Sequence, residues 1–179
     1  NHPIKQLQHR QMFEWIPYFR AHNMSWDEPD GTYSGKNHPV DEFGYQNALT
    51  PSVTSMLEWD DPDELSAIGR RFHPVWRRAA ELMLCCDYYP LTECRMSAED
   101  FYAMQFDGED EGFIQVIRNI GVKTDSIVIF PHVDESKTYV FTDPLGKRSL
   151  TVDGKVLARD GWCETLPHRS GVVWFYRKK

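Results

Sequence analysis

The spacing of apolar residues changes about halfway along this chain, and this change limits the possible folds more than any other feature. In residues 65–84 apolar side chains recur about every 3.6 residues, the spacing of one helix face. From about residue 100 onward, apolar and polar residues alternate or form short β-branched and aromatic runs, which is typical of strands. We therefore expect a helical region at residues 1–96 and an antiparallel β-sandwich at residues 97–179.

The first region carries three predicted helices. They are 4–19, 41–57 with an interruption at Pro51, and 61–84. The third has the clearest beginning, because Asp61 can cap it, Pro62 suits its first position and Glu64 completes a capping box. Pro74 falls inside this helix and is expected to kink or break it. Residues 27–40 are rich in glycine and proline and are predicted to form a surface loop.

The second region carries short predicted strands. They centre on residues 102–106, 114–116, 127–129, 139–141, 150–152 and 173–175. The Asp153-Gly154 pair lies between two apolar runs and predicts a tight hairpin, because this dipeptide tolerates the positive φ angles of a type I′ turn. The stretch 172–176 is apolar on both faces, which predicts a buried central strand.

Charge and hydropathy argue against two classes of partner. The formal net charge is −7 and the isoelectric point is about 5.5, whereas nucleic-acid binding needs a cluster of basic residues. No apolar run approaches the roughly 20 residues of a membrane-spanning helix. We therefore expect a soluble chain with no nucleic-acid and no membrane partner, in the cytoplasm, the periplasm or outside the cell. An oligomer is compatible with this composition.

The four cysteines are Cys85, Cys86, Cys94 and Cys163. The first two are adjacent, which makes a disulfide between them strained, and no Cys-x-x-Cys spacing supports a structural zinc site. The seven histidines include no pair spaced for one metal ion beside a carboxylate on a helix. We expect the cysteines to be buried thiols without chemistry, and we expect no metal and no cofactor.

Several segments resemble one protein family. Asp87-Tyr-Tyr-Pro-Leu-Thr92, after the long predicted helix, resembles the junction between barrel and sandwich in melibiase-type α-galactosidases. Residues 102–118 resemble the first sandwich hairpin of that family, in which a Gly-x-x-x-x-x-Arg pattern marks the second strand. The runs 139–146 and 166–173 fit the C-terminal domain of the family, and residues 13–22 resemble the barrel region just after the catalytic acid.

This resemblance implies a fold and a mechanism. It implies that residues 1–96 form the C-terminal portion of a (β/α)8 barrel and residues 97–179 an antiparallel β-sandwich. It also implies a retaining glycoside hydrolase that removes terminal α-linked galactose with two Asp residues, one as nucleophile and one as acid and then base. In the family both lie upstream of the matched region. We therefore expect no catalytic residue in this stretch, no activity of the stretch by itself, and an acid/base Asp shortly before Asn1.

A cluster of polar and aromatic residues follows the first predicted helix. This segment is expected to be a strand or a loop, in which Trp26 stacks on a sugar ring while His22 and Asn23 bind its hydroxyl groups. Asp27 continues the cluster, and His2 borders the rim of the active site under the family placement. The candidate substrate-binding residues are therefore His2, His22, Asn23, Trp26 and Asp27. The alternative is a half-buried loop anchored by Trp26.

Other hypotheses stay open alongside the enzyme. The acidic runs 60–64 and 107–111 are expected to cap a helix and to form a solvated hairpin loop. No Gly-x-Ser-x-Gly elbow and no glycine-rich phosphate loop occur in the sequence. The enzyme hypothesis implies an oligosaccharide or glycoside as the partner. The alternative function is a non-catalytic carbohydrate-binding or accessory β-sandwich module, and a third is a structural domain without a ligand.

Overall fold

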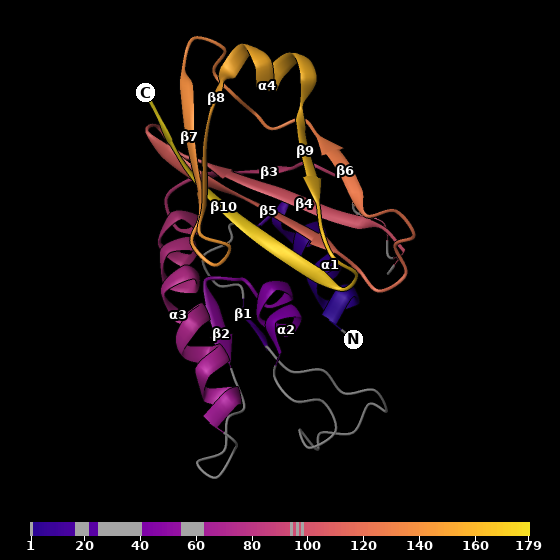
Figure 1. Cartoon of the computed structure of the whole chain (residues 1–179). Coiled ribbons are helices and arrows are strands. Elements are labelled where there is room, and N and C mark those ends of the chain that lie inside the picture. Colours follow the sequence, from indigo (N-terminus) through magenta and orange to yellow (C-terminus); the bar gives the residue numbers. More distant parts are fainter. Residues whose placement is uncertain are drawn as a thin grey trace. The chain divides into compact units, whose positions relative to one another are not determined.

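The computed structural model describes residues 2–16, 22–24, 41–54, 63–93, 95, 97 and 99–179 (Figure 1). The chain divides into two compact units, Asn1–Leu84 and Cys85–Lys179. The division lies before the boundary expected at residue 96, so residues 85–96 group with the second unit. The reason is a strand at Asp87–Pro90, which pairs with the sheet of that unit.

The first unit alternates helices and strands. Its elements are α1 (His2–Phe13), β1 (His22–Met24), α2 (Glu42–Asn47), β2 (Ser52–Thr54) and α3 (Asp63–Met83). Strands β1 and β2 pair in parallel, with His22 opposite Ser52 and Met24 opposite Thr54 (Figure 1). Two parallel neighbours need a crossover between them, and α2 lies in that connection. The first unit is therefore an α/β arrangement rather than a helical one.

The helices of the first unit are shorter than the sequence suggested. Helix α1 ends at Phe13 instead of continuing to residue 19, because Pro17 disfavours a helical residue before it. Helix α2 begins where the Asp41 carboxylate accepts a hydrogen bond from the Gly44 N–H at 2.7 Å. It ends at Asn47, and the chain then forms β2 where a longer helix was predicted.

Helix α3 is the long helix that the apolar spacing predicted. It runs from Asp63 to Met83, and its assignment continues through Pro74, so this proline does not break the helix. Phe72, Val75 and Ala79 are buried on one face of it, whereas Pro74 is exposed. The predicted cap and first position, Asp61 and Pro62, lie outside the described residues.

The second unit is mainly antiparallel sheet. Its strands are β3 (Asp87–Pro90), β4 (Phe101–Asp107), β5 (Glu111–Arg118), β6 (Ser126–Ile129), β7 (Thr138–Asp143), β8 (Arg148–Asp153), β9 (Trp162–Thr165) and β10 (Ser170–Lys178). Six of them form one sheet in the order β3-β4-β5-β10-β7-β8, and β6 and β9 form a second, two-stranded sheet. The antiparallel strands expected in this region are therefore confirmed.

Strand β10 confirms the prediction of a buried central strand. It pairs with β5 on one side, where Val172 lies opposite Val116, and with β7 on the other, where Tyr176 lies opposite Phe141. Val173, Trp174 and Tyr176 are buried, although they do not all face the same way. A strand with neighbours on both sides and both faces covered has no position for a run of polar residues.

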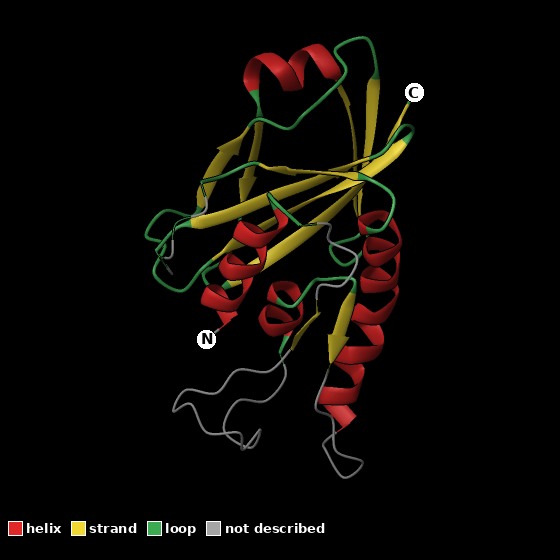
Figure 2. Cartoon of the chain, turned by 180° about the vertical axis from the view of Figure 1, so that it is seen from behind, coloured by secondary structure: helices red, strands yellow, loops and turns green. Residues whose placement is uncertain are grey.

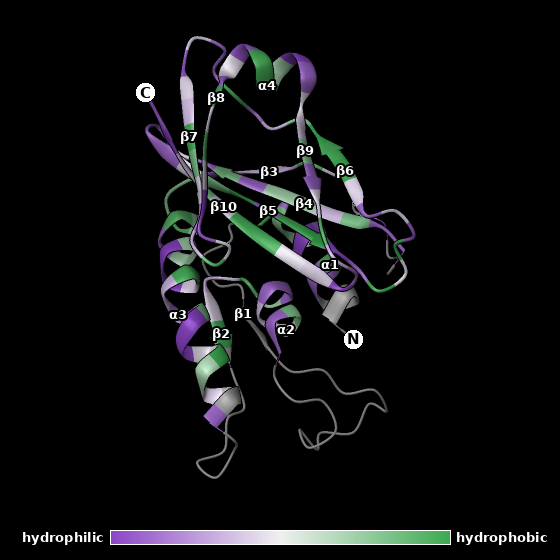
Figure 3. Cartoon of the chain, in the orientation of Figure 1, coloured by the Kyte–Doolittle hydropathy of each residue, from purple (hydrophilic) through white to green (hydrophobic). Residues whose placement is uncertain are grey.

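The core of the second unit is shared by the two sheets and by α4 (Gly154–Asp160). Apolar residues of β6 and α4 contribute to it, and Figure 3 shows both segments as partly hydrophobic. The buried residues of this core are Phe101, Ala103, Ile114, Val116, Val122, Ile129, Tyr139, Phe141, Leu157, Trp162, Leu166, Val172, Trp174 and Tyr176. Burial of so many aromatic rings gives the unit a large hydrophobic stabilisation of its own.

The hairpin predicted at Asp153-Gly154 is wrong, because a helix follows β8 at this point (Figure 2). The Asp153 carboxylate accepts a hydrogen bond from the Lys155 N–H at 2.8 Å and caps α4. Gly154 does not have a positive φ angle. Its lack of a side chain serves a close approach instead, since a Cβ atom there would lie 2.3 Å from the Asp134 carbonyl oxygen.

Candidate functional site

The predicted substrate-binding residues lie on and just after the first-unit elements that precede β2. His2 is the first residue of α1, and His22 and Asn23 lie in β1. Trp26 and Asp27 lie outside the described residues, and so do the side chains of His2, His22 and Asn23. The structure therefore places three of the five positions in the fold.

The ends of β1 and β2 mark the edge where a site is expected. The last residues of the two strands, Met24 and Thr54, are register partners, so both strands end at the same edge of their sheet. In parallel α/β folds, ligands bind outside the carboxyl ends of the strands. The sequence continues from β1 directly into Ser25, Trp26 and Asp27. In the sequence, Trp26 and Asp27 thus follow the carboxyl end of β1.

A hollow of about 420 Å³ lies within the first unit, between α2, β2 and α3. Tyr45 and Phe72 stack in its wall with ring centroids 5.4 Å apart, and the Trp76 indole donates a hydrogen bond to the Thr50 carbonyl at 3.0 Å. Arg70 and His73 add the charged and titratable groups of the wall. None of the described residues that line it is a carboxylate, so the described part of this hollow holds no acid pair of the kind a glycosidase needs.

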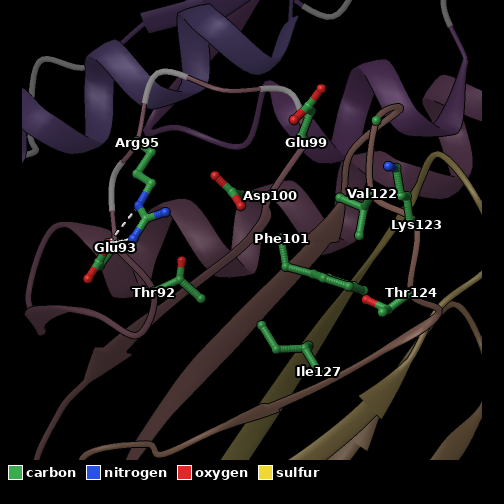
Figure 4. Close-up of a pocket in the computed structure, with 11 residues that line it drawn as sticks. Thr92, Glu93, Arg95, Glu99, Asp100, Phe101, Val122, Lys123, Thr124 and Ile127 are labelled. Carbon is green, nitrogen blue, oxygen red and sulfur yellow. Dashed lines mark hydrogen bonds and ion pairs between the residues drawn. The ribbon is translucent and has the colours of Figure 1, made fainter.

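A second hollow, of about 580 Å³, lies within the second unit. Figure 4 shows charged side chains around the Phe101 ring, with Arg95 hydrogen-bonded to Glu93 at 2.7 Å. That hydrogen bond raises the pKa of the Arg95 guanidinium. The described lining of the hollow mixes charges of both signs, and the one aromatic ring among these described residues, Phe101, is buried. A sugar would therefore find no exposed ring on which to stack in this described lining.

A polar cluster that is largely shielded from solvent joins β4 to β10. The Asp107 carboxylate accepts hydrogen bonds from the Tyr176 hydroxyl at 2.6 Å and the Lys178 ammonium at 2.8 Å, and its other oxygen lies 3.2 Å from Nδ1 of His132. Burial and the Asp107 contact raise the pKa of Tyr176, which keeps its hydroxyl group protonated as a donor. The run 107–111 was expected to form a solvated hairpin loop, and Glu109 and Asp110 are exposed there, whereas the Asp107 side chain is only 9% exposed.

The same cluster accounts for the side chain of Gln105 and for the glycine at position 112. The Gln105 side chain donates to the Tyr176 hydroxyl and to the His132 carbonyl, and its oxygen accepts from the His132 N–H. A Cβ atom at Gly112 would lie 2.4 Å from the Tyr176 hydroxyl oxygen, so only glycine fits there. Because the largely buried Asp107 carboxylate accepts hydrogen bonds from two residues of β10, it joins the strands β4 and β10.

A second cluster surrounds the buried carboxylate of Glu164 on β9. One of its oxygens accepts hydrogen bonds from the indoles of Trp162 and Trp174, at 3.0 and 2.7 Å. The other lies 3.5 Å from the Arg148 guanidinium, which also binds Asp143 at 2.9 Å. Sequence reasoning missed this cluster, because its members come from four strands. The one local clue was the Trp-x-Glu spacing, which puts Trp162 and Glu164 on the same face of a strand.

The expectation of buried thiols is wrong for two cysteines. Cys85 and Cys163 are exposed, and Cys86 is partly exposed, whereas Cys94 lies outside the described residues. On β9 the inward positions belong to Trp162 and Glu164, so the residue between them points outward. Cys85 lies in a turn after α3.

The described residues include no group of three or more His, Cys, Asp or Glu side chains arranged to hold a metal ion. Among the helices in the described part of the chain, none is long and apolar enough to span a membrane.

No protein-family model matches the sequence, and no curated protein matches it significantly. Solved structures do match. The galactosidase domain of the α-galactosidase–sucrose kinase AgaSK matches all of this chain and 25% of its own, with a TM-score of 0.69 and 13% identity. The α-galactosidase AgaA variant from Geobacillus stearothermophilus in complex with raffinose matches 99% of this chain and 24% of its own, with a TM-score of 0.68 and 13% identity. An α-amylase from Geobacillus thermoleovorans in complex with acarbose matches 72% of this chain and 30% of its own, with a TM-score of 0.51 and 12% identity.

These identities establish the fold alone. The chain spans about a quarter of the length of the α-galactosidase structures that it matches. The resemblance noted in the sequence is confirmed at this level, because the two α-galactosidases match the chain from end to end and the amylase does not. The chain has the fold of the matching quarter of family 36 α-galactosidases.

Proposed function

We propose that this chain is the C-terminal part of a retaining glycoside hydrolase that removes terminal α-linked galactose. The observation that carries the proposal is the match of the whole chain to α-galactosidase structures, one of them a complex with raffinose. Raffinose ends in an α-linked galactose, so the proposed substrate class is an α-galactoside or an oligosaccharide that carries one. The two catalytic Asp residues that the family implies belong, in this proposal, to the part of the parent protein upstream of this stretch.

The proposal assigns residues 1–96 to the C-terminal portion of a (β/α)8 barrel. The parallel pairing of β1 and β2, with helices before, between and after them, supports this assignment. In such barrels the chemistry lies at the carboxyl ends of the strands. His22, Asn23, Trp26 and Asp27 then bind the sugar from the end of β1, and His2 borders the rim of the site.

The activity is tested on the full-length parent protein. We expect it to hydrolyse an aryl α-galactoside and raffinose, with α-galactose as the first product seen by NMR, because a retaining mechanism preserves the anomeric configuration. First formation of β-galactose would contradict retention. Hydrolysis of aryl α-glucosides with no action on α-galactosides would contradict the sugar assignment. Binding of α-galactosides without any turnover would favour the accessory carbohydrate-binding module instead.

The proposed sugar contact is tested at Trp26. Loss of a ring that stacks on a sugar costs about 1.5 kcal/mol, so Trp26→Ala is expected to raise KM about tenfold. The matched control is Phe130→Ala, which removes an aromatic ring that is 59% exposed in the second unit. An unchanged KM for Trp26→Ala would favour the alternative, in which Trp26 anchors a loop.

A further inference from the structure

Two adjacent thiols lie in the turn between α3 and β3. The sulfur atoms of Cys85 and Cys86 are 3.9 Å apart, in a segment that belongs to neither the helix nor the strand. Cys85 is exposed to solvent and Cys86 is partly exposed. Reagents in solution can therefore reach the first sulfur directly, and the second lies within reach of the first.

Packing fixes the position of the second sulfur. A Cβ atom at Gly108 would lie 2.8 Å from the Cys86 sulfur, so the thiol occupies space that a side chain at residue 108 would need. Burial, the neighbouring Cys85 and the negative charges of Asp107 and Glu111 together raise the pKa of the Cys86 thiol to about 12, with burial the largest cause. Cys86 is thus held protonated beside an exposed partner.

We propose that Cys85 and Cys86 form a modification site for low-molecular-weight disulfides, at which a mixed disulfide on Cys85 resolves into a reversible disulfide between the two neighbours. The Cys85 thiolate attacks the reagent disulfide, whose S–S bond breaks and releases one thiolate. Cys86 then loses its proton to solvent and attacks the Cys85 sulfur, which releases the second thiolate. The protein loses two electrons and two protons, and the reagent is reduced to two thiols.

The geometry makes this bond reversible. Adjacent Cα atoms are about 3.8 Å apart, below the usual range of about 4.4–6.8 Å for disulfides, and the sulfur atoms must approach to about 2.05 Å. The bond that forms is therefore strained, and strained, exposed disulfides are the easily reduced ones. Location in a turn lets the backbone adjust without breaking the hydrogen bonds within α3 or β3.

The test uses the full chain with Cys94→Ser and Cys163→Ser, so that only the two neighbours can react. The protein is treated with oxidised glutathione, its remaining thiols are alkylated, and it is cleaved after glutamate. Cleavage after Glu81 and Glu93 isolates both cysteines in peptide 82–93. We expect this peptide to lose two hydrogens with no adduct, and dithiothreitol to restore them. A peptide that retains glutathione, or one alkylated at both cysteines, would overturn the proposal.

Single variants in the same background separate the two roles. Cys86→Ser is expected to stop at a stable glutathione adduct on Cys85, because no second thiol can displace it. Cys85→Ser is expected to react much more slowly, because the remaining thiol is mostly protonated. In the chain with both thiols, decay of the mixed disulfide should speed up about tenfold per pH unit between about pH 7 and 9, as the Cys86 thiolate fraction rises. Equal adduct rates for the two variants, or a decay independent of pH, would contradict this sequence of steps.

Discussion

The two units of this chain differ in the size of the sheet and of the buried core that their described residues form. The second unit has strands of up to nine residues, a sheet of six strands, and a core of buried rings contributed by both of its sheets. In the described part of the first unit, the two strands have three residues each, and Met12, Trp15 and Ile16 are exposed near the end of α1. The described sheet of the first unit is small for the apolar faces of three helices. We therefore predict that the second unit folds by itself and that the first unit needs further partners.

The second unit also has two polar clusters that join its strands, one around Glu164 and one around Asp107. In the second unit, Glu164 ties β9 of the small sheet to Trp174 of the large one, and Asp107 ties β4 to β10. The Glu164 carboxylate is buried, the Asp107 carboxylate is only 9% exposed, and each accepts several hydrogen bonds, which favours one arrangement of strands. Both clusters lie within the second unit. We therefore expect the second unit to unfold cooperatively.

The largest expected effect is a difference in folding between the two units expressed separately. Fragment 85–179 should unfold in one cooperative transition, whereas fragment 1–84 should show no such transition, because its helices lack most of the sheet they would cover. Circular dichroism during a thermal scan measures both. A soluble, cooperatively melting fragment 1–84 would break the comparison and count against the barrel assignment.

A third fragment tests whether the second unit begins at residue 85 or at residue 97. Residues 97–179 should still fold, but with lower stability than residues 85–179, because β4 loses its partner β3, including the pair Tyr88 and Phe106. Equal stability of the two fragments in urea would show that β3 adds nothing to the sheet.

Matched truncations of a core ring in each unit should have unequal effects. Phe106 is fully buried in the second unit and Phe72 is almost fully buried in the first. Phe106→Ala is expected to cost about 3–5 kcal/mol in the main unfolding transition of the whole chain. Phe72→Ala should leave that transition unchanged, because the second unit unfolds by itself. Equal losses, measured by urea unfolding, would mean that the two units unfold together.

Substitution of the buried carboxylate of Glu164 tests whether this residue links the two sheets of the second unit. Glu164→Ala leaves two indole donors and part of Arg148 without their acceptor, which is expected to cost about 3 kcal/mol in fragment 85–179. Glu164→Gln keeps one acceptor oxygen and should cost less. The control is Cys163→Ala, one residue away and exposed, with an expected change within about 0.5 kcal/mol. If Glu164→Ala matched this control in urea unfolding, the cluster would contribute no stability.

Local sequence patterns predicted the elements whose environment is uniform. The apolar and aromatic runs in 101–118 and 172–176 predicted strands, and nearly every residue of those strands is buried or partly buried. The hairpin prediction at Asp153-Gly154 was wrong because the same dipeptide is compatible with two local structures. Asp-Gly fits a type I′ turn and also a helix start, and only the close approach of Gly154 to the Asp134 carbonyl distinguishes them.

The candidate site could be predicted only in part. Spacing alone could not show that β1 and β2 are parallel, because their pairing joins residues 22–24 to 52–54 across a long connection. The Gly-x-x-x-x-x-Arg pattern came from a resemblance and now has a physical reason. Gly112 makes room for the Tyr176 hydroxyl, and Arg118 binds the Leu166 carbonyl at 2.7 Å. Both residues hold the sheet together and neither points to chemistry.

The smallest expected effect compares one helix cap from each unit. Asp153 caps α4 and Asp41 caps α2, each through one carboxylate hydrogen bond to a backbone N–H. Asp153→Ala should lower the stability of the second unit by about 1 kcal/mol, the usual value of such a cap. Asp41→Ala should leave the main transition of the whole chain where it is, because α2 belongs to the other unit. Asp160→Ala, at the exposed end of α4, is the control within the second unit, since its ion pair with Arg159 is fully solvated. A shift of the main transition by Asp41→Ala as large as that by Asp153→Ala would show that the first unit contributes to the same cooperative fold.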